Sequence, residues 1–158
     1  MPASNSEKVT VKQTKTGWVL VHPRSVRERD ADIAEVEAML EANEFDIARD
    51  ELRYLVQGCS EHIGIHFMLG DIALAEKDIK LARGHYGYAY DIGFKALKRA
   101  KFPKPVLQTE PDNELFFEAG KQLAWCLKLL EKEDLMRQVV EFLLSCDKSD
   151  PLQLRSFL

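Results

Sequence analysis

The chain has 158 residues, of which 46% are hydrophobic and 30% are charged, and its formal net charge is −4. This length is enough for one domain with a substantial core, and the composition is that of a globular protein rather than a disordered one. Because the net charge is negative, nucleic acid and anionic membranes are not expected partners.

Residues 1–24 are predicted to form a tail followed by the only β-prone stretch of the chain. Residues 1–8 are polar and lack the apolar core of a signal peptide. Residues 9–22 alternate weakly in polarity and place Gly17 before the apolar run 18–21, which predicts one strand or a short hairpin. Pro23 ends this segment.

Cysteine usage and hydropathy both favour the cytoplasm. No window approaches the ~20 apolar residues that a membrane-spanning helix needs. Cys59, Cys126 and Cys146 are widely spaced, which is typical of small core residues in a reducing compartment. We therefore expect a cytoplasmic protein.

A pair of helices is predicted over residues 25–58. Ser25 and Glu28 have the spacing of a capping box, in which each side chain bonds to a free amide at a helix start. Apolar residues then fall on one helical face up to Leu40. After a turn at residues 43–44, a second helix is expected to end near Gly58.

A second pair of helices is predicted over residues 61–99. The helix at 61–76 is apolar nearly all round, so it needs cover on more than one side. The helix at 78–99 contains Gly84, Gly87 and Gly93, each of which costs ~1 kcal/mol relative to alanine. We expect these glycines to permit close helix approach beside three tyrosines: Tyr86, Tyr88 and Tyr90.

The last predicted pair of helices covers residues 114–130 and 134–146. Pro103, Pro105 and Pro111 precede it and exclude a continuous helix over 102–113. The tail at 151–158 is apolar enough to require something to lie against.

Apolar positions repeat with a period of 34 residues. At this shift Phe45 falls on Ile79, Ala48 on Ala82 and Leu52 on Tyr86. A fixed period of this size is the signature of stacked helical repeats. The predicted fold class is therefore all-α, an α-solenoid of three helical hairpins over residues 25–158, with a short N-terminal extended segment.

The motif residues of the middle unit, at about 63–96, are Leu69-Gly70 in the first helix and a small–aromatic–small set in the second helix: Ala82, Tyr86 and Ala89. With these residues the unit resembles the tetratricopeptide repeat family. The first unit, at about 29–62, keeps Phe45, Ala48 and Leu52 but lacks the Leu-Gly pair.

In the last unit, four residues are spaced like the second-helix residues and the closing proline of the same family: Val139, Leu143, Cys146 and Pro151. Ala82 and Val139 are 57 residues apart instead of 34, which implies an insertion of 23 residues at about 97–119.

The resemblance implies a non-catalytic interaction protein whose first helices line a concave groove for a peptide or a partner helix. Transfer of the family's groove positions gives ten residues: Ile33, Glu37, Leu40, Phe67, Met68, Asp71, Leu74, Trp125, Lys128 and Lys132. The subfamily that grips acidic chaperone tails has Lys, Arg and Asn at such positions. Ile33, Glu37, Met68 and Asp71 stand there in this chain, so a carboxylate clamp is not expected.

Trp125 is the sharpest candidate for a contact residue. It falls in the polar stripe of its helix, where an exposed tryptophan is a common anchor for a partner. The alternative is intramolecular cover by the insertion, the N-terminal strand or the C-terminal tail. In that case residues 18–21 or 152–158 fill the groove, and the protein is a self-contained or dimer-forming structural unit.

A zinc sensor is a further alternative. Cys59, His62 and His66 have the spacing C-x2-H-x3-H, and His85 is the nearest candidate for a fourth ligand. Because His66 lies on an apolar helix, a buried histidine bonded to the backbone is the favoured interpretation. The sequence has no phosphate loop and no nucleophile elbow, so neither an enzyme nor a cofactor is expected.

A basic run closes the second pair of helices: Lys95, Lys98, Arg99, Lys101 and Lys104, with Phe102 among them. Such a run is typical of a solvated helix end, where cations also favour the helix dipole. Contact with RNA or an acidic partner is the alternative.

Overall fold

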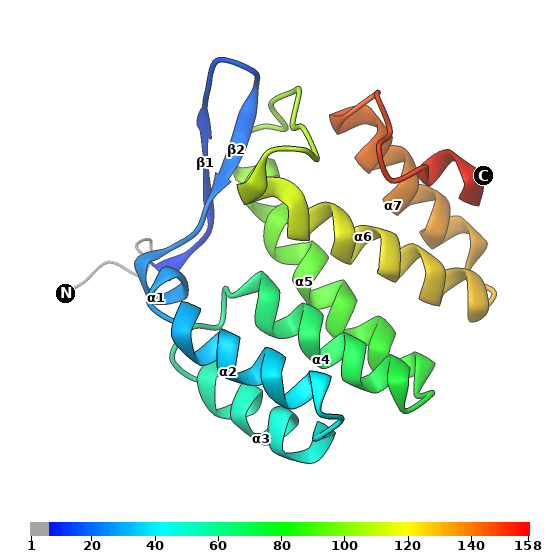
Figure 1. Cartoon of the computed structure of the whole chain (residues 1–158). Helices are drawn as coiled ribbons and strands as arrows, with labels where there is room; N and C mark the ends of the chain where they lie inside the picture. The colour runs from blue at the N-terminus through cyan, green and yellow to red at the C-terminus, as the bar shows by residue number, and fades with distance from the viewer. Residues whose placement is uncertain (1–6) are drawn as a thin grey trace.

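The computed structural model describes residues 7–158, so residues 1–6 of the predicted tail lie outside the described part of the chain. Helices dominate the described residues, which confirms the all-α prediction (Figure 1). Three helical hairpins follow one another: α2 (Asp30–Glu41) with α3 (Phe45–Val56), α4 (Ile63–Ala75) with α5 (Ile79–Arg99), and α6 (Pro111–Leu129) with α7 (Glu133–Cys146). None of the helices within residues 7–158 has the length and apolar character needed to cross a membrane.

The predicted extended segment is an antiparallel β-hairpin. Strands β1 (Thr10–Gln13) and β2 (Trp18–Val21) pair in a register that sets Thr10 against Val21. β1 lies against α5 and β2 against α6, so the hairpin closes one end of the second and third helical hairpins (Figure 1). Its core contacts are Val9 and Leu20, both completely buried.

The predicted capping box at Ser25 and Glu28 is wrong. A short helix, α1 (Arg24–Arg27), begins directly after Pro23, whose carbonyl accepts the amides of residues 26 and 27. Ser25 therefore lies inside the first turn, and its buried hydroxyl has no hydrogen-bond partner. Glu28 pairs with Arg24 instead, at 3.3 Å. The chain breaks at residues 28–29 before α2 begins.

The start of α6 also differs from the prediction. The helix begins at Pro111 rather than at residue 114, with the proline in its first turn. A proline is tolerated there because the first amides of a helix have no partner within the helix. The turns that the prolines enforce are thus confined to the linker at residues 100–110.

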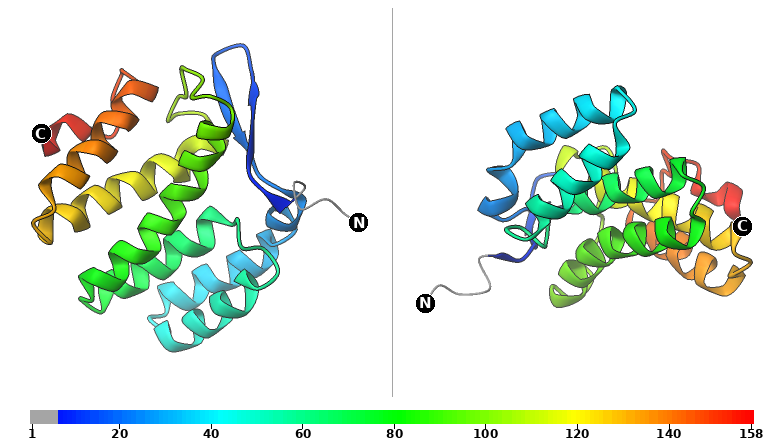
Figure 2. Two further views of the ribbon diagram at one scale, coloured as in Figure 1. Left: turned by 180° about the vertical axis from the view of Figure 1, so that it is seen from behind. Right: turned by 90° about the horizontal axis from the view of Figure 1, so that it is seen from below.

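The three hairpins pack in sequence order. α3 contacts both α2 and α4, α5 contacts both α4 and α6, and α4 also reaches α6 (Figure 2). Buried residues form two separate groups, a central cluster built mainly from α4 to α7 and an N-terminal cluster built from α1 to α4. The C-terminal 3-10 helix η2 (Leu154–Phe157) lies on α7 and α6, and Leu154 is buried in the central cluster.

A glycine contact recurs in the second and third hairpins. A Cβ added at Gly70 would lie 2.6 Å from the ring of Tyr86, and one added at Gly120 would lie 2.5 Å from Leu143. Gly120 follows Gly70 by 50 residues, 16 more than the period of 34, and the glycine-to-partner separation grows from 16 residues to 23, a difference of seven. The structure therefore divides the excess of 23 residues, placing 16 before Gly120 and seven at the tip of the third hairpin.

The glycines of α5 serve different purposes. A Cβ at Gly93 would collide with the ring of Phe116, which is the close helix approach that we expected. No atom lies within 4 Å of a Cβ at Gly84, and only Leu123, at 3.7 Å, is near one at Gly87. The expectation of close approach is therefore wrong for Gly84 and Gly87, which leave open space beside α5.

Candidate functional site

The predicted groove residues lie on the first helix of each hairpin, apart from Lys132, which directly precedes α7. We call this side, formed by α2, α4 and α6, the first-helix face. On α2, Ile33 and Leu40 are half-buried against the N-terminal cluster, whereas Glu37 is exposed. The α2 part of the face therefore combines an apolar base with a free carboxylate.

The α4 part of the face is organised around Tyr86, a buried residue of α5. The Tyr86 hydroxyl donates a hydrogen bond to Asp71 at 2.5 Å, and the Phe67 ring meets the Tyr86 ring edge-on with centroids 5.5 Å apart. Phe67 and Leu74 pack against the central cluster, and Met68 packs against the N-terminal cluster. These four predicted residues thus bridge the two clusters.

Glu118 on α6 is a neighbour of Asp71 that the sequence did not indicate. Burial raises the pKa of Asp71 above its ordinary value, the Tyr86 hydrogen bond opposes this rise, and the Glu118 carboxylate adds to it. Sequence spacing missed Glu118 because it assigned the whole excess of residues to the segment before α6. The seven extra residues at the hairpin tip amount to about two helical turns, so Glu118 and Trp125 share one face of α6.

Trp125 is 44% exposed, and neither the β-hairpin nor the C-terminal segment buries it. The C-terminal segment does reach the next turn of α6, where the Lys128 ammonium lies 5.9 Å from the centre of the Phe157 ring. Lys132 is exposed at the start of α7. The predicted α6 residues are therefore only partly covered within the chain.

Charge is distributed unevenly along the first-helix face. Each of its three helices carries one carboxylate: Glu37, Asp71 and Glu118. Within residues 7–158, no salt bridge involves any of them. Cations gather at the tip of the third hairpin, where Lys128 and Lys132 are exposed. The face thus has apolar side chains between unpaired carboxylates, and a basic end.

The cysteine and histidines of the proposed zinc sensor are engaged with the backbone. The Cys59 thiol donates to a carbonyl of its own turn, the Nδ1 of His62 accepts the amide of Ile65 at 3.1 Å, and the Nε2 of His66 lies 2.9 Å from the Ser60 carbonyl. Within the described residues, no three His, Cys, Asp or Glu side chains converge in a metal-binding arrangement. The geometry is that of a helix start held by histidine.

The role of His62 at the start of α4 leads to a pH prediction. Burial lowers the pKa of His62 from 6.5 to about 4, and the charges of His22 and His66 act in the same direction. As the pH falls below 6.5, the unfolded chain binds a proton that the folded chain excludes, so stability present above this pH is lost down to about pH 4. Near pH 5 we expect a loss of about 2 kcal/mol, measurable by urea unfolding at two pH values.

His62→Asn is the matched variant for this experiment. Asparagine can still accept an amide hydrogen bond at a helix start, but it does not titrate. The variant should therefore lose less stability than the wild type between neutral pH and pH 5. The same loss in both proteins would contradict the prediction.

The basic run at the end of α5 is partly used within the fold. Lys95 pairs with Asp91 at 2.8 Å, and Arg99 donates to the Val9 carbonyl at 2.7 Å. Phe102 packs against two other aromatic rings, those of Phe94 and Phe142. The run therefore contributes to local packing as well as to a solvated surface.

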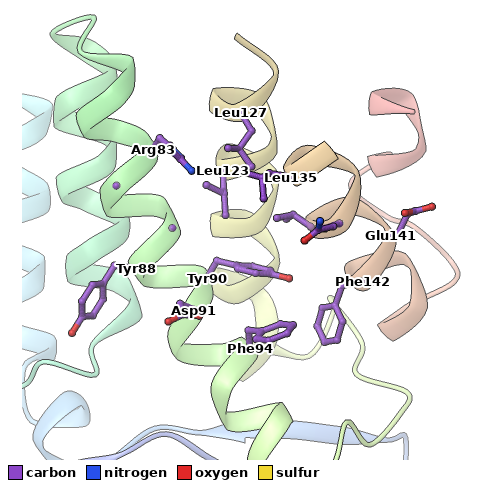
Figure 3. Close-up of a pocket in the computed structure, with 14 residues that line it drawn as sticks. Arg83, Tyr88, Tyr90, Asp91, Phe94, Leu123, Leu127, Leu135, Glu141 and Phe142 are labelled. Carbon is purple, nitrogen blue, oxygen red and sulfur yellow. The ribbon is translucent and has the colours of Figure 1, made fainter. Parts of the chain in front are cut away.

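A cavity of about 770 Å³ lies between α5, α6 and α7 (Figure 3). Its lining includes Leu123 and Leu127, which project from the opposite side of α6 to Trp125, and none of the ten predicted groove residues. Gly84 and Gly87 form part of its α5 wall. A glycine-rich stretch in a long helix was the only sequence signal for this space, and we had interpreted it as close packing.

No protein-family model matches this sequence, and no curated protein matches it.

Proposed function

We propose that this chain is a short α-solenoid similar to tetratricopeptide repeat proteins, and that it acts as a non-catalytic interaction module. Its partner is a peptide or an amphipathic helix that docks on the first-helix face, with Trp125 as an anchor. The observation that carries this proposal is the 44% exposure of Trp125 on a face that also presents half-buried apolar side chains.

Equivalent packing positions in the three hairpins support the solenoid. Val36, Gly70 and Gly120 occupy the same place in the first helices, and Leu52, Tyr86 and Leu143 are the fully buried partners in the second helices. Units that share one internal contact and pack in sequence order are the basis of repeat architectures.

Surface chemistry supports binding to a partner protein. Trp125 offers a large apolar area and a hydrogen-bond donor, which is the combination typical of residues that dominate binding energy. Phe67 and Met68 are only half-buried nearby on α4 and add apolar area to the same face. The carboxylates of Asp71 and Glu118 limit the partners to those that are not acidic at the centre of the contact.

The buried polar groups support a non-catalytic role in a reducing compartment. His62, His66 and Asp71 each have a structural hydrogen-bond partner, so their shifted pKa values have an explanation other than catalysis. Cys59, Cys126 and Cys146 are free and buried, which fits small core residues in the cytosol.

The test is affinity capture from native cytosol with the wild type and with Trp125→Ala in parallel. We expect Trp125→Ala to reduce recovery of specific partners by about tenfold or more, because truncation of an anchor residue costs about 2 kcal/mol or more. Since the side chain is exposed, the melting temperature should fall by only about 2 °C or less.

Tyr54→Ala is the matched control, because Tyr54 is a 68% exposed aromatic residue on α3, outside the first-helix face. Its recovered proteins should equal those of the wild type. Equal recovery with Trp125→Ala, or a fall of many degrees in its melting temperature, would contradict the assignment of the site.

Self-association remains the second candidate function, and the contact between Lys128 and Phe157 favours it, since the chain already covers part of this face itself. Sedimentation equilibrium distinguishes the two candidates. A dimer that reverts to the 18.1 kDa monomer with Trp125→Ala would favour self-association through this face.

A further inference from the structure

The cavity between α5, α6 and α7 has the size and lining of a ligand site. Its volume of about 770 Å³ lies within the range of roughly 300–1,000 Å³ that is common for small-molecule sites. Leu123, Leu127 and Val139 form an aliphatic floor, and they are nearly buried even though the cavity is open to solvent.

The two ends of the cavity differ in chemistry. At one end, Phe94 and Phe142 meet edge-on with ring centroids 4.9 Å apart, beside Tyr90 (Figure 3). At the other end, the Arg83 side chain extends from α5 toward Leu123. Arg83 and Phe94 are eleven residues apart on one helix, so these ends are separated by about 16 Å.

Arg83 supplies the positive charge of the cavity. Within residues 7–158, neither a salt bridge nor a side-chain hydrogen bond satisfies its guanidinium. The two nearby acids do not neutralise it: Asp91 pairs with Lys95, and the Glu141 side chain points away from the cavity (Figure 3). A guanidinium at the mouth of an apolar cavity favours a planar anion such as a carboxylate.

The lining between these ends fits a hydrocarbon better than a polypeptide. Gly84, Gly87 and aliphatic side chains dominate it, and they offer few partners for the amide groups that an extended peptide brings. A helix about 10 Å across and about 16 Å long would occupy roughly 1,300 Å³, which exceeds the cavity. An alkyl chain needs neither polar partners nor this width.

We propose that this cavity binds an amphiphilic monocarboxylate, with its carboxylate at Arg83 and its alkyl chain extending over Leu123 and Val139 toward Phe94 and Phe142. This site is independent of the first-helix face, because its residues project from the other side of α6. It would give the protein a small-molecule ligand in addition to a partner.

Isothermal titration calorimetry with sodium decanoate tests the proposal, and decyltrimethylammonium serves as the cationic probe of equal chain length. We expect the wild type to bind decanoate about tenfold or more tightly than the cation, because a charge-assisted hydrogen bond forms only with the anion. Arg83→Met should reduce this preference to about twofold or less. Lys98→Met removes an exposed cation of α5 outside the cavity and should keep the wild-type preference.

Gly87→Leu locates the binding. A side chain at this position enters the cavity, and leucine also favours the helix more than glycine does, so the variant should fold. It should weaken binding of both probes by about tenfold or more. The absence of decanoate binding to the wild type, equal affinity for the two probes, or wild-type affinity in Gly87→Leu would each overturn the proposal.

Discussion

Replacing Asn113 by leucine is expected to lower the free energy of unfolding by about 4 kcal/mol. Asn113 is completely buried at the start of α6. Its Oδ1 accepts the Leu20 amide at 2.9 Å, and its Nδ2 donates to the carbonyls of Trp18 and Leu107, each at 3.0 Å. Leucine has a similar volume but leaves three backbone groups without partners, and each such group costs about 1–3 kcal/mol when buried.

Thr16→Val is the control for this experiment. The Thr16 hydroxyl donates to Glu110 at 2.8 Å, so it also joins the β-hairpin to the segment before α6, but it does so in solvent. Its loss should cost about 0.5 kcal/mol or less. Urea unfolding of both variants measures the difference. Similar stabilities would show that the buried amide is not what holds the β-hairpin in place.

Gly93→Val is expected to destabilise the protein by about 3 kcal/mol. A Cβ at this position collides with the ring of Phe116. That ring cannot move aside easily, because it is fully buried and stacked on Tyr90 with centroids 5.3 Å apart and packed edge-on against Phe117. Either α5 must separate from α6 or the aromatic group must repack, and overpacked cores lose stability in both cases.

Gly84→Val on the same helix is the matched substitution. No atom lies within 4 Å of its added Cβ, and valine is at least as good a helix former as glycine. Its stability should therefore stay within about 0.5 kcal/mol of the wild type. Thermal unfolding of the pair separates the steric effect from helix propensity. A Gly93→Val protein as stable as Gly84→Val would contradict the close packing of α5 on α6.

Helix positions could be predicted because periodicity is a local signal. The apolar faces between Ile33 and Leu55 and the turn at Asn43 are visible in a few neighbouring residues, and the 34-residue period adds the order of the hairpins. Helix starts depend on which competing local signal prevails. Pro23 prevails over the capping pair at Ser25 and Glu28, and Pro111 is accommodated in the first turn of α6.

The candidate site was predictable only in part, because spacing along the chain does not say where extra residues are accommodated. Trp125 was found from its place in a polar stripe, whereas Glu118 was missed until the contact between Gly120 and Leu143 fixed the register of the third hairpin. The cavity beside Arg83 is a tertiary feature. Glycine in a helix predicts either contact or empty space, and only the neighbouring helix decides which.

The separation of the core into two clusters means that folding need not be all-or-none. Opening of α2 and α3 exposes the N-terminal cluster but leaves the aromatic packing around Phe116 and Tyr90 intact. Many carboxylates crowd this first hairpin, so their mutual repulsion lowers the cost of its opening further at low ionic strength. The amino-terminal third of the chain is therefore the segment whose folding a bound partner would reinforce most.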